Sequence, residues 1–168
     1  MRVVLLAALT VDGKIARDAH ERTDWSSRED KRLFAQTSRE AGVLIMGRHT
    51  YETLAAPLPG RFHLVLTRQP MRSAAPPNVE FSSQPPDRVL AELEQRGYRT
   101  AVLAGGAQTY RAFLAAGLVD ELWLTIEPLA FGAGITLFGD DPLDLRLALL
   151  ECRQLNADSV HLRYRILR

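Results

Sequence analysis

The sequence lacks the features that mark several classes of protein. Cysteine occurs once in 168 residues, as Cys152, so an internal disulfide framework is excluded, and no cysteine–histidine spacing typical of a zinc site occurs. The 21 basic and 20 acidic side chains give a formal net charge of +1, which argues against a nucleic-acid partner. The apolar runs are too short to span a bilayer. We therefore expect a cytoplasmic protein that holds no metal and binds neither nucleic acid nor membrane.

Apolar runs alternate with amphipathic stretches along the chain, which is the pattern of repeated strand–helix units. The predicted buried strands are Val3–Leu9, Val43–Met46, Phe62–Thr67, Thr100–Ala104 and Leu122–Ile126. The predicted helices run from Ser26 or Ser27 to about Glu40, from His49 to Leu54, around Val89–Leu93, and over Gln108–Ala115. A chain of this length fits one domain, residues 1–168, that buries roughly 70% of its unfolded surface.

Three stretches depart from this alternation. A polar loop, Thr10–Asp24, follows the first strand, and residues 69–86 hold five prolines around a short strand at Val79–Ser82. Near the C-terminus, Leu145–Leu155 and Val160–Leu167 flank a turn-forming segment, which predicts an antiparallel hairpin. The expected fold is therefore α/β: a three-layer sandwich around a mostly parallel sheet with an antiparallel edge.

Two junctions between a strand and a helix carry glycine. Gly47 ends an apolar run and is followed at once by Arg48, His49 and Thr50, whereas Gly105–Ala107 joins the later strand to its helix. Helix N-termini attract phosphate through free N–H groups and the macrodipole, and arginine can grip a phosphate bidentately. Two such junctions suggest a dinucleotide held by its phosphates, although a solvated helix start would have the same local sequence.

The cations near these junctions bear on which dinucleotide would bind. Arg68 follows the Phe62–Thr67 strand and could reach the same cleft as Arg48. No acidic residue stands at the end of either strand, where an NAD site usually places a carboxylate on the ribose hydroxyls. Cations at this place favour the 2′-phosphate of NADP.

Several polar or aromatic side chains are candidates for chemistry, and each has a structural alternative. Asp30 shares a helix face with Leu33 and Phe34, so it is either a buried carboxyl with a raised pKa or a first-turn acid that complements the helix dipole. Asp12 follows the first strand and either faces a substrate or forms an Asp-Gly turn. Trp25 either stacks on a ring or packs at the entry to the helix.

The segment after the second predicted strand resembles a known family of enzymes. The run Ile45–Glu52, followed by Pro57–Arg61, resembles dihydrofolate reductase without a gap. Trp25, Asp30 and Phe34 reproduce the spacing of that family's active-site tryptophan, carboxylate and substrate-stacking phenylalanine. Leu124–Thr125 looks like the strand whose threonine bonds the carboxylate, and Gly105–Gly106 followed by Tyr110 is similar to the second cofactor-binding turn.

Other segments are similar to the pyrimidine reductase domain of riboflavin biosynthesis. These are Leu9–Ala16, Gly117–Leu122, Glu127–Pro128 and Gly132–Gly134. The first active-site loop of dihydrofolate reductase carries an Asn-x-Leu-Pro-Trp pattern, whereas this chain has Arg22–Trp25 there. The chain therefore resembles a stand-alone reductase of this superfamily, closest to the pyrimidine reductase domain, and the family resemblance alone suggests a homodimer.

The resemblance implies that NADPH donates a hydride to a carbon–nitrogen double bond. Its implied cofactor contacts are Gly47, Arg48, His49, Thr50, Thr67, Arg68, Gly105, Gly106, Ala107, Gln108 and Tyr110. Its implied catalytic residues are Asp30, Asp12 and Thr125, and its implied substrate contacts are Lys14, Trp25, Phe34, Arg61 and Glu127.

Three readings of the substrate side stay open. An aminouracil ribose phosphate is favoured, because its phosphate would meet the cations Lys14, Arg17, Arg22 and Arg28. Dihydrofolate is the alternative, with Arg61 on its glutamate carboxylate. A catalytically silent NADP-binding protein is the third reading, and the presence of Asp30 and Thr125 argues against it.

Overall fold

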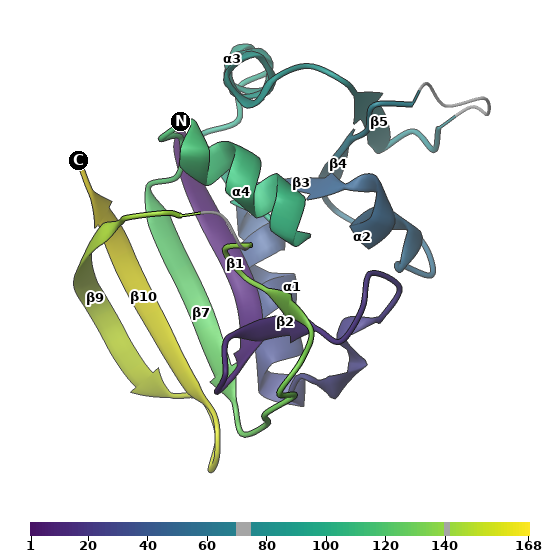
Figure 1. Cartoon of the computed structure of the whole chain (residues 1–168). Coiled ribbons are helices and arrows are strands. Elements are labelled where there is room, and N and C mark those ends of the chain that lie inside the picture. Colours follow the sequence, from purple (N-terminus) through teal and green to yellow (C-terminus); the bar gives the residue numbers. More distant parts are fainter. Residues whose placement is uncertain (70–74, 140–141) are drawn as a thin grey trace.

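The computed structural model describes residues 1–69, 75–139 and 142–168. Its main sheet has eight strands in the order β5-β4-β3-β6-β1-β7-β10-β9 (Figure 1). The strands are β1 (Arg2–Thr10), β3 (Val43–Gly47), β4 (Phe62–Leu66), β5 (Val79–Ser82), β6 (Thr100–Leu103), β7 (Glu121–Glu127), β9 (Arg146–Gln154) and β10 (Val160–Leu167). The six strands from β5 to β7 are parallel, whereas β10 and β9 pair antiparallel. The predicted fold class is confirmed.

Helices cover both faces of this sheet (Figure 1). They are α1 (Arg28–Ala41), α2 (Arg48–Glu52), α3 (Pro86–Gln95) and α4 (Ala107–Ala115). Neighbouring residues of a strand point to opposite faces, so on β1 Leu5 joins the apolar cluster under α3 and α4, and Leu6 joins the cluster with Phe34 of α1. Burial on both faces explains why the parallel strands are continuous apolar runs in the sequence. No helix in the described ranges is long and apolar enough to cross a membrane.

Helix α1 begins at a serine cap. The Ser27 hydroxyl accepts a hydrogen bond from the backbone N–H of Asp30 at 3.2 Å, and Gly42, with φ of +76°, ends the helix. Of the two serines that could have capped the helix, Ser27 is therefore the cap. This choice places Asp30 in the first turn, on the side that faces the sheet.

The polar loop after β1 contains structure that the sequence did not predict. Strand β2 (Lys14–Ala16) pairs antiparallel with β8 (Ile135–Thr136), and a short 3-10 helix covers Thr23–Trp25. The partner strand lies far away in the sequence, so local composition alone indicated a loop. Within residues 69–86, the short strand is confirmed as β5, and residues 70–74 lie outside the described residues.

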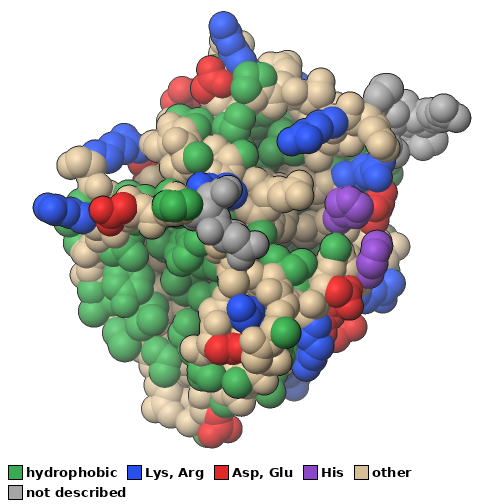
Figure 2. All heavy atoms as spheres, in the orientation of Figure 1, with side chains coloured by type: hydrophobic (Ala, Val, Ile, Leu, Met, Phe, Trp, Pro, Cys, Tyr) green, Lys and Arg blue, Asp and Glu red, His purple; other side chains and the backbone are tan. Residues whose placement is uncertain are grey.

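The C-terminal hairpin has one apolar and one charged face. Apolar side chains gather over β9 and β10 in Figure 2, and Leu149 at 57% is the most exposed leucine there. Leu149 pairs with Tyr164 across the strands. The other face carries Arg163, which bonds Glu151 at 3.1 Å and lies 3.4 Å from Glu121.

Candidate active site

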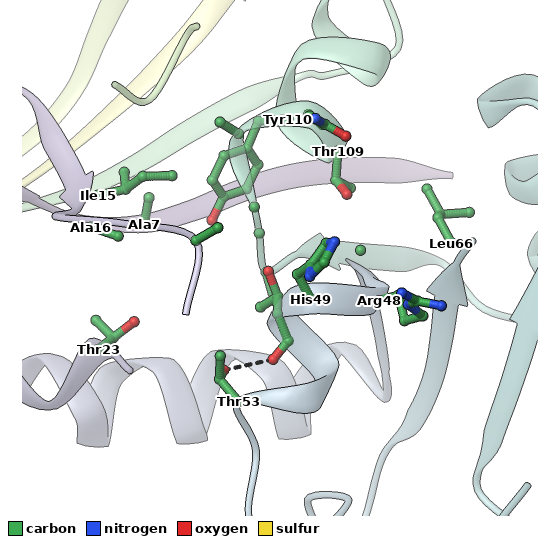
Figure 3. Close-up of a pocket in the computed structure, with 18 of the residues that line it drawn as sticks. Ala7, Ile15, Ala16, Thr23, Arg48, His49, Thr53, Leu66, Thr109 and Tyr110 are labelled. Atoms are coloured by element: carbon green, nitrogen blue, oxygen red, sulfur yellow. Dashed lines mark hydrogen bonds between the residues drawn. The ribbon is translucent and has the colours of Figure 1, made fainter. Parts of the chain in front are cut away.

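A cleft of about 1240 Å³ opens at the carboxyl ends of β1, β3, β4 and β6, the edge where parallel sheets bind ligands. Arg48 and Leu66 lie toward one end of it in Figure 3, and Ala7, Ile15 and Tyr110 lie toward the other. The expected site residues that line the cleft are Asp30, Phe34, Gly47, Arg48, His49, Thr50, Thr67, Arg68, Gly105, Gly106, Ala107, Gln108 and Tyr110.

The two glycine junctions meet in this cleft. Strands β3 and β6 are neighbours, and the Gly47 N–H donates to the Gly105 carbonyl at 2.8 Å. A Cβ at Gly47 would lie 2.9 Å from Thr109 Oγ1, and Gly105 has a φ of +113°, which favours glycine. The peptide bond between Gly105 and Gly106 is cis. Bare backbone therefore forms the floor where a ligand can approach closely.

Cationic side chains stand beside this floor. Arg48 is the first residue of α2; its guanidinium donates to Gln69 Oε1 at 2.6 Å and lies 3.3 Å from Glu52 Oε1. His49 is largely exposed, and its ring meets His20 edge to face at 6.4 Å. Arg48 and Arg68 give this end of the cleft a local positive charge suited to phosphate.

Asp30 supplies the buried acid of the cleft. It is 8% exposed, and burial raises its pKa above that of an ordinary carboxyl, with a smaller contribution from the charge of Glu127. The hydroxyls of Thr125 and Ser26 act in the opposite direction, because they favour the carboxylate. The burial predicted from the helix face is thus confirmed. It favours a proton-holding group over a solvated helix-start acid.

Tyr110 closes the same part of the cleft. Its hydroxyl donates to the Leu6 carbonyl at 2.9 Å. Burial and the charge of Asp30 raise the pKa of this phenol well above its ordinary value, so it stays neutral. Phe34, one helical turn after Asp30, forms an aromatic wall. A planar ring would fit between such groups.

Asp12 is not among the residues that line the cleft, and its expected contact with substrate stays a prediction. Its carboxylate accepts hydrogen bonds from Thr10 Oγ1 at 2.5 Å and from the backbone N–H groups of Phe131 and Gly132 at 3.2 and 2.8 Å. These bonds, with that of Thr10 the largest, lower the pKa of Asp12 to about 2. Asp12 joins two loops, and the Asp-Gly turn alternative holds because Gly13 N–H donates to the Thr10 carbonyl at 2.9 Å.

Lys14 and Trp25 also lie outside the cleft lining. Lys14 is on β2, where its backbone N–H donates to Thr10 Oγ1 at 2.9 Å. The Trp25 ring packs edge to face on the Phe131 ring, with 5.3 Å between the ring centroids. The guanidinium carbon of Arg17 lies 3.8 Å from the centroid of the same Phe131 ring. The packing alternative for Trp25 therefore describes the structure.

The side chains of Glu127 and Arg61 are buried, and both form hydrogen bonds with other groups of the protein. Glu127 accepts from the Ser27 backbone N–H and hydroxyl at 2.8 and 2.7 Å and from the Ser159 hydroxyl at 2.5 Å. Arg61 is 6% exposed and donates to the carbonyl of Pro59, at 3.2 Å, and to acceptors of α1. Those acceptors are the Ala35 carbonyl, at 3.4 Å, and the Ser38 hydroxyl. Neither side chain is among the residues that line the cleft, and their expected contacts with substrate stay predictions.

Thr125 lies behind Asp30, and sequence reasoning missed its second neighbour. Thr125 Oγ1 is 3.3 Å from Nδ1 of His161, and both residues are buried. The signal was the register of the hairpin, because β10 places His161 directly opposite Thr125 on β7. Within the described ranges, no group of three or more His, Cys, Asp or Glu side chains could hold a metal ion.

The sequence matches the family model described as Dihydrofolate reductase over residues 2–136. Dihydrofolate reductase type 3 of Salmonella typhimurium is 32% identical over 125 residues, which cover 74% of this chain and 71% of that protein. The uncharacterized protein YwjB of Bacillus subtilis is 28% identical over 171 residues, which cover 97% of each chain.

Solved structures share the fold. A pyrimidine reductase-like protein of Corynebacterium diphtheriae aligns with a TM-score of 0.76 and 18% identity, covering 99% of this chain and 92% of that one. A dihydrofolate reductase of Enterococcus faecalis, complexed with NADP(H), aligns with a TM-score of 0.71 and 22% identity, covering 98% and 96%. At these identities the likeness concerns the fold, and it includes proteins named for either substrate.

The burial of Arg61 predicts a structural role. Arg61→Ala removes a charged donor from the buried Ser38 hydroxyl and from two partly buried carbonyls, and it leaves a cavity, so it should lower the free energy of unfolding by about 2–3 kcal/mol. Arg39→Ala, which removes an exposed arginine of α1, should cost about 0.5 kcal/mol or less. Urea denaturation of both variants measures the difference. If stability were unchanged and substrate affinity were lost, the result would indicate that Arg61 contacts the substrate.

The raised pKa of Asp30 predicts a pH-dependent stability difference. At low pH the carboxyl is protonated in both the folded and the unfolded chain, and burial costs little. As pH rises from the ordinary carboxyl pKa of the unfolded chain to the higher pKa of folded Asp30, the unfolded chain releases this proton while the folded state keeps it, so the folded state loses stability; above the folded pKa the loss is complete. Asp30→Asn should therefore be more stable than the wild type at pH 7 and about equal to it near pH 4, measured by urea midpoints. A variant that is less stable at every pH would indicate that Asp30 is instead a first-turn acid that complements the dipole of α1.

Proposed function

We propose that this chain, which belongs to the dihydrofolate reductase family, transfers a hydride from NADPH to a carbon–nitrogen double bond of a pyrimidine- or pterin-type ring. One observation carries the proposal. A single cleft contains both a cation-rimmed floor of bare glycine backbone and a buried carboxyl, Asp30, beside an aromatic wall. The first feature suits a dinucleotide phosphate, and the second suits a heterocyclic ring that must be oriented and protonated.

The residues at the cation end fit the cofactor. A side chain at Gly47 would fill the space beside Thr109, and its absence lets a pyrophosphate approach the backbone. Arg48 and Arg68 would hold the 2′-phosphate that distinguishes NADPH from NADH. The cofactor, when bound, supplies the hydride, and the protein supplies position and a proton source.

The opposite end of the cleft would hold the ring that accepts the hydride. Phe34 and Ile15 line it and exclude water from the ring faces. The Asp30 carboxyl lies at its edge, where it can accept hydrogen bonds from ring N–H groups and hold a proton close to the ring nitrogen. A raised pKa keeps that proton available closer to neutral pH than an ordinary carboxyl would.

The Asp30 carboxylate can bind a pterin ring through two hydrogen bonds. A 2-amino-4-oxo ring presents two adjacent donors, a ring N–H and an amino group, which match the two oxygens of one carboxylate. The aminouracil ring presents N3–H between two carbonyl oxygens, but on its other edge N1–H lies beside the exocyclic N–H on C6, which is a similar pair of donors. Asp30 can therefore bind either ring, and we favour dihydrofolate, or a related dihydropterin, because few cations line the cleft for a ribose phosphate.

The aminouracil ribose phosphate is the second candidate, and one observation favours it. Arg22 lines the substrate end of the cleft and could meet a phosphate. The other cations expected to help it, Lys14, Arg17 and Arg28, are not among the cleft-lining residues that the structure describes, and Arg17 pairs with Glu21. The phosphate of this substrate would thus meet Arg22 and Lys31, and the Lys31 ammonium already donates to the Asp24 and Ser26 carbonyls at 2.9 and 3.0 Å.

The test is NADPH oxidation by the purified chain, assayed separately with dihydrofolate and with the aminouracil ribose phosphate. We expect turnover with dihydrofolate. Asp30→Asn should lower that turnover by about a hundredfold or more, the usual contribution of a positioned acid, while leaving NADPH affinity nearly unchanged. Turnover of the ribose phosphate alone would reverse the substrate assignment, and turnover of neither, with NADPH bound, would indicate a silent binding protein.

Arg48 provides the test of cofactor preference. Loss of a charge-assisted contact to the 2′-phosphate should weaken NADPH binding about tenfold in Arg48→Ala, because the guanidinium is partly exposed and partly screened. Affinity for NADH, which has no such phosphate, should change little. Arg99→Ala, an exposed arginine away from the cleft, is the matched control for fluorescence titration. If the affinities for NADPH and NADH fell equally, Arg48 would not be the residue that contacts the 2′-phosphate.

A further inference from the structure

One cation of α1 lies beside the acid and the aromatic wall of the cleft. The basic residues of this helix, which is described along its whole length, are Arg28, Lys31, Arg32 and Arg39. Of these, only Lys31 is among the residues that line the cleft. Asp30 lies four residues before Phe34 and Lys31 lies three before it, so both are neighbours of Phe34 on the helix surface. Because Asp30 is buried and Lys31 is exposed, Lys31 stands where the aromatic wall meets solvent.

The Lys31 ammonium is held in place by backbone oxygens. Nζ donates to the Asp24 carbonyl at 2.9 Å and to the Ser26 carbonyl at 3.0 Å, at the end of the short 3-10 helix. An ammonium has three hydrogens, and the third has no protein acceptor within the described residues. A long side chain that is already fixed loses less rotamer freedom when it binds a ligand. Lys31 therefore keeps one N–H for an anion.

Arg61 is the cation that the family resemblance placed on an anionic tail of the substrate, and its surroundings differ from those of Lys31. The Arg61 guanidinium is 6% exposed and donates to the Pro59 carbonyl at 3.2 Å and to the Ser38 hydroxyl of α1. To reach a ligand in the cleft it would have to leave these bonds, whereas Lys31 needs to break none. Lys31 is thus the better placed of the two cations.

Carboxyl groups near Lys31 limit the charge that its ligand can carry. Asp24 and Asp30 both line the cleft with Lys31, which bonds the backbone of the first and follows the second in the sequence. Arg22, two residues before Asp24, adds a positive charge to the lining. A ligand group with two negative charges is repelled by nearby carboxylates more than a group with one. A carboxylate therefore suits Lys31 better than a phosphate dianion.

We propose that Lys31 binds a carboxylate on the tail of the substrate, and so selects a ring that carries such a tail over the bare ring. The proposal rests on the proposed function. A dihydropterin ring held by Asp30 and Phe34 would have its substituent at the exposed side of the cleft, and in dihydrofolate that substituent ends in glutamate carboxylates. The free N–H of Lys31 then forms a charge-assisted hydrogen bond with one of them.

Two ligands with the same ring isolate the contribution of the tail. Dihydrofolate carries the glutamate, and 6-methyl-7,8-dihydropterin lacks it. Calorimetric titrations with NADP⁺ present, which has no hydride to donate, measure binding without turnover. Lys31→Gln should raise the Kd of dihydrofolate about tenfold, the loss of a partly screened charge-assisted bond, and leave that of the methyl dihydropterin nearly unchanged. The lost charge also raises the pKa of Asp30, but both ligands present the same ring to Asp30, so the ratio of their Kd values reports the tail.

Two further variants serve as controls. Lys31→Arg keeps the positive charge and should retain most of the affinity for dihydrofolate. Arg32→Gln removes the neighbouring exposed cation of α1, which is not among the lining residues, and should change neither Kd.

Three results would overturn the proposal. An equal rise in Kd for both ligands in Lys31→Gln would mean that Lys31 acts on the ring, through the 3-10 helix that it holds. An unchanged Kd for dihydrofolate would remove Lys31 from the tail. A loss confined to the aminouracil ribose phosphate would assign Lys31 to a phosphate. Selective loss of dihydrofolate binding in a chain without turnover would contradict the reductase activity alone, whereas turnover with an equal rise for both ligands would contradict the role of Lys31 alone.

Discussion

The site depends on the buried carboxylate of Glu127, which fastens the start of α1 to the sheet. Its oxygens accept from the backbone and hydroxyl of Ser27 and from the hydroxyl of Ser159. Ser27 is also the cap of α1, and its hydroxyl accepts from the N–H of Asp30. One buried acceptor thereby connects β7, the start of β10 and the helix that carries the acid of the cleft. Because buried bonds to a charged group are strong and directional, Asp30 is held in place by the core.

The glycine-lined end of the cleft was predictable because its determinants are local in sequence. Each glycine junction consists of a continuous apolar strand, glycine and the first turn of a helix, and these units form wherever the strand is buried on both faces. The one non-local requirement is that β3 and β6 be neighbours, which brings Gly47 and Gly105 within hydrogen-bonding distance. Parallel strands place their carboxyl ends at one edge, so any neighbouring pair would present both junctions to the same cleft.

The opposite end of the cleft could not be predicted in the same way, because several side chains expected there are held by contacts between distant segments. Asp12 is bound by backbone N–H groups about 120 positions away. Lys14 lies in the β2–β8 strand pair, which no local sequence pattern predicts. Arg61 follows a recognisable motif, yet its guanidinium is bound by acceptors of α1. The motif shows that Arg61 matches a particular position of the family, but the contacts of its side chain depend on the segments that pack around it.

The two buried carboxylates near the start of α1 show how environment separates roles. Glu127 already accepts three hydrogen bonds from the protein, so it has little capacity left for a ligand. Asp30, one helical turn from the cap, faces the cleft, and the charge of Glu127 helps to raise its pKa. The two carboxylates therefore have different roles: Glu127, whose oxygens are already hydrogen-bonded, fixes the geometry, and Asp30 keeps its oxygens for the substrate that we propose. Both were candidates by sequence type, and hydrogen-bond saturation is the property that distinguishes them.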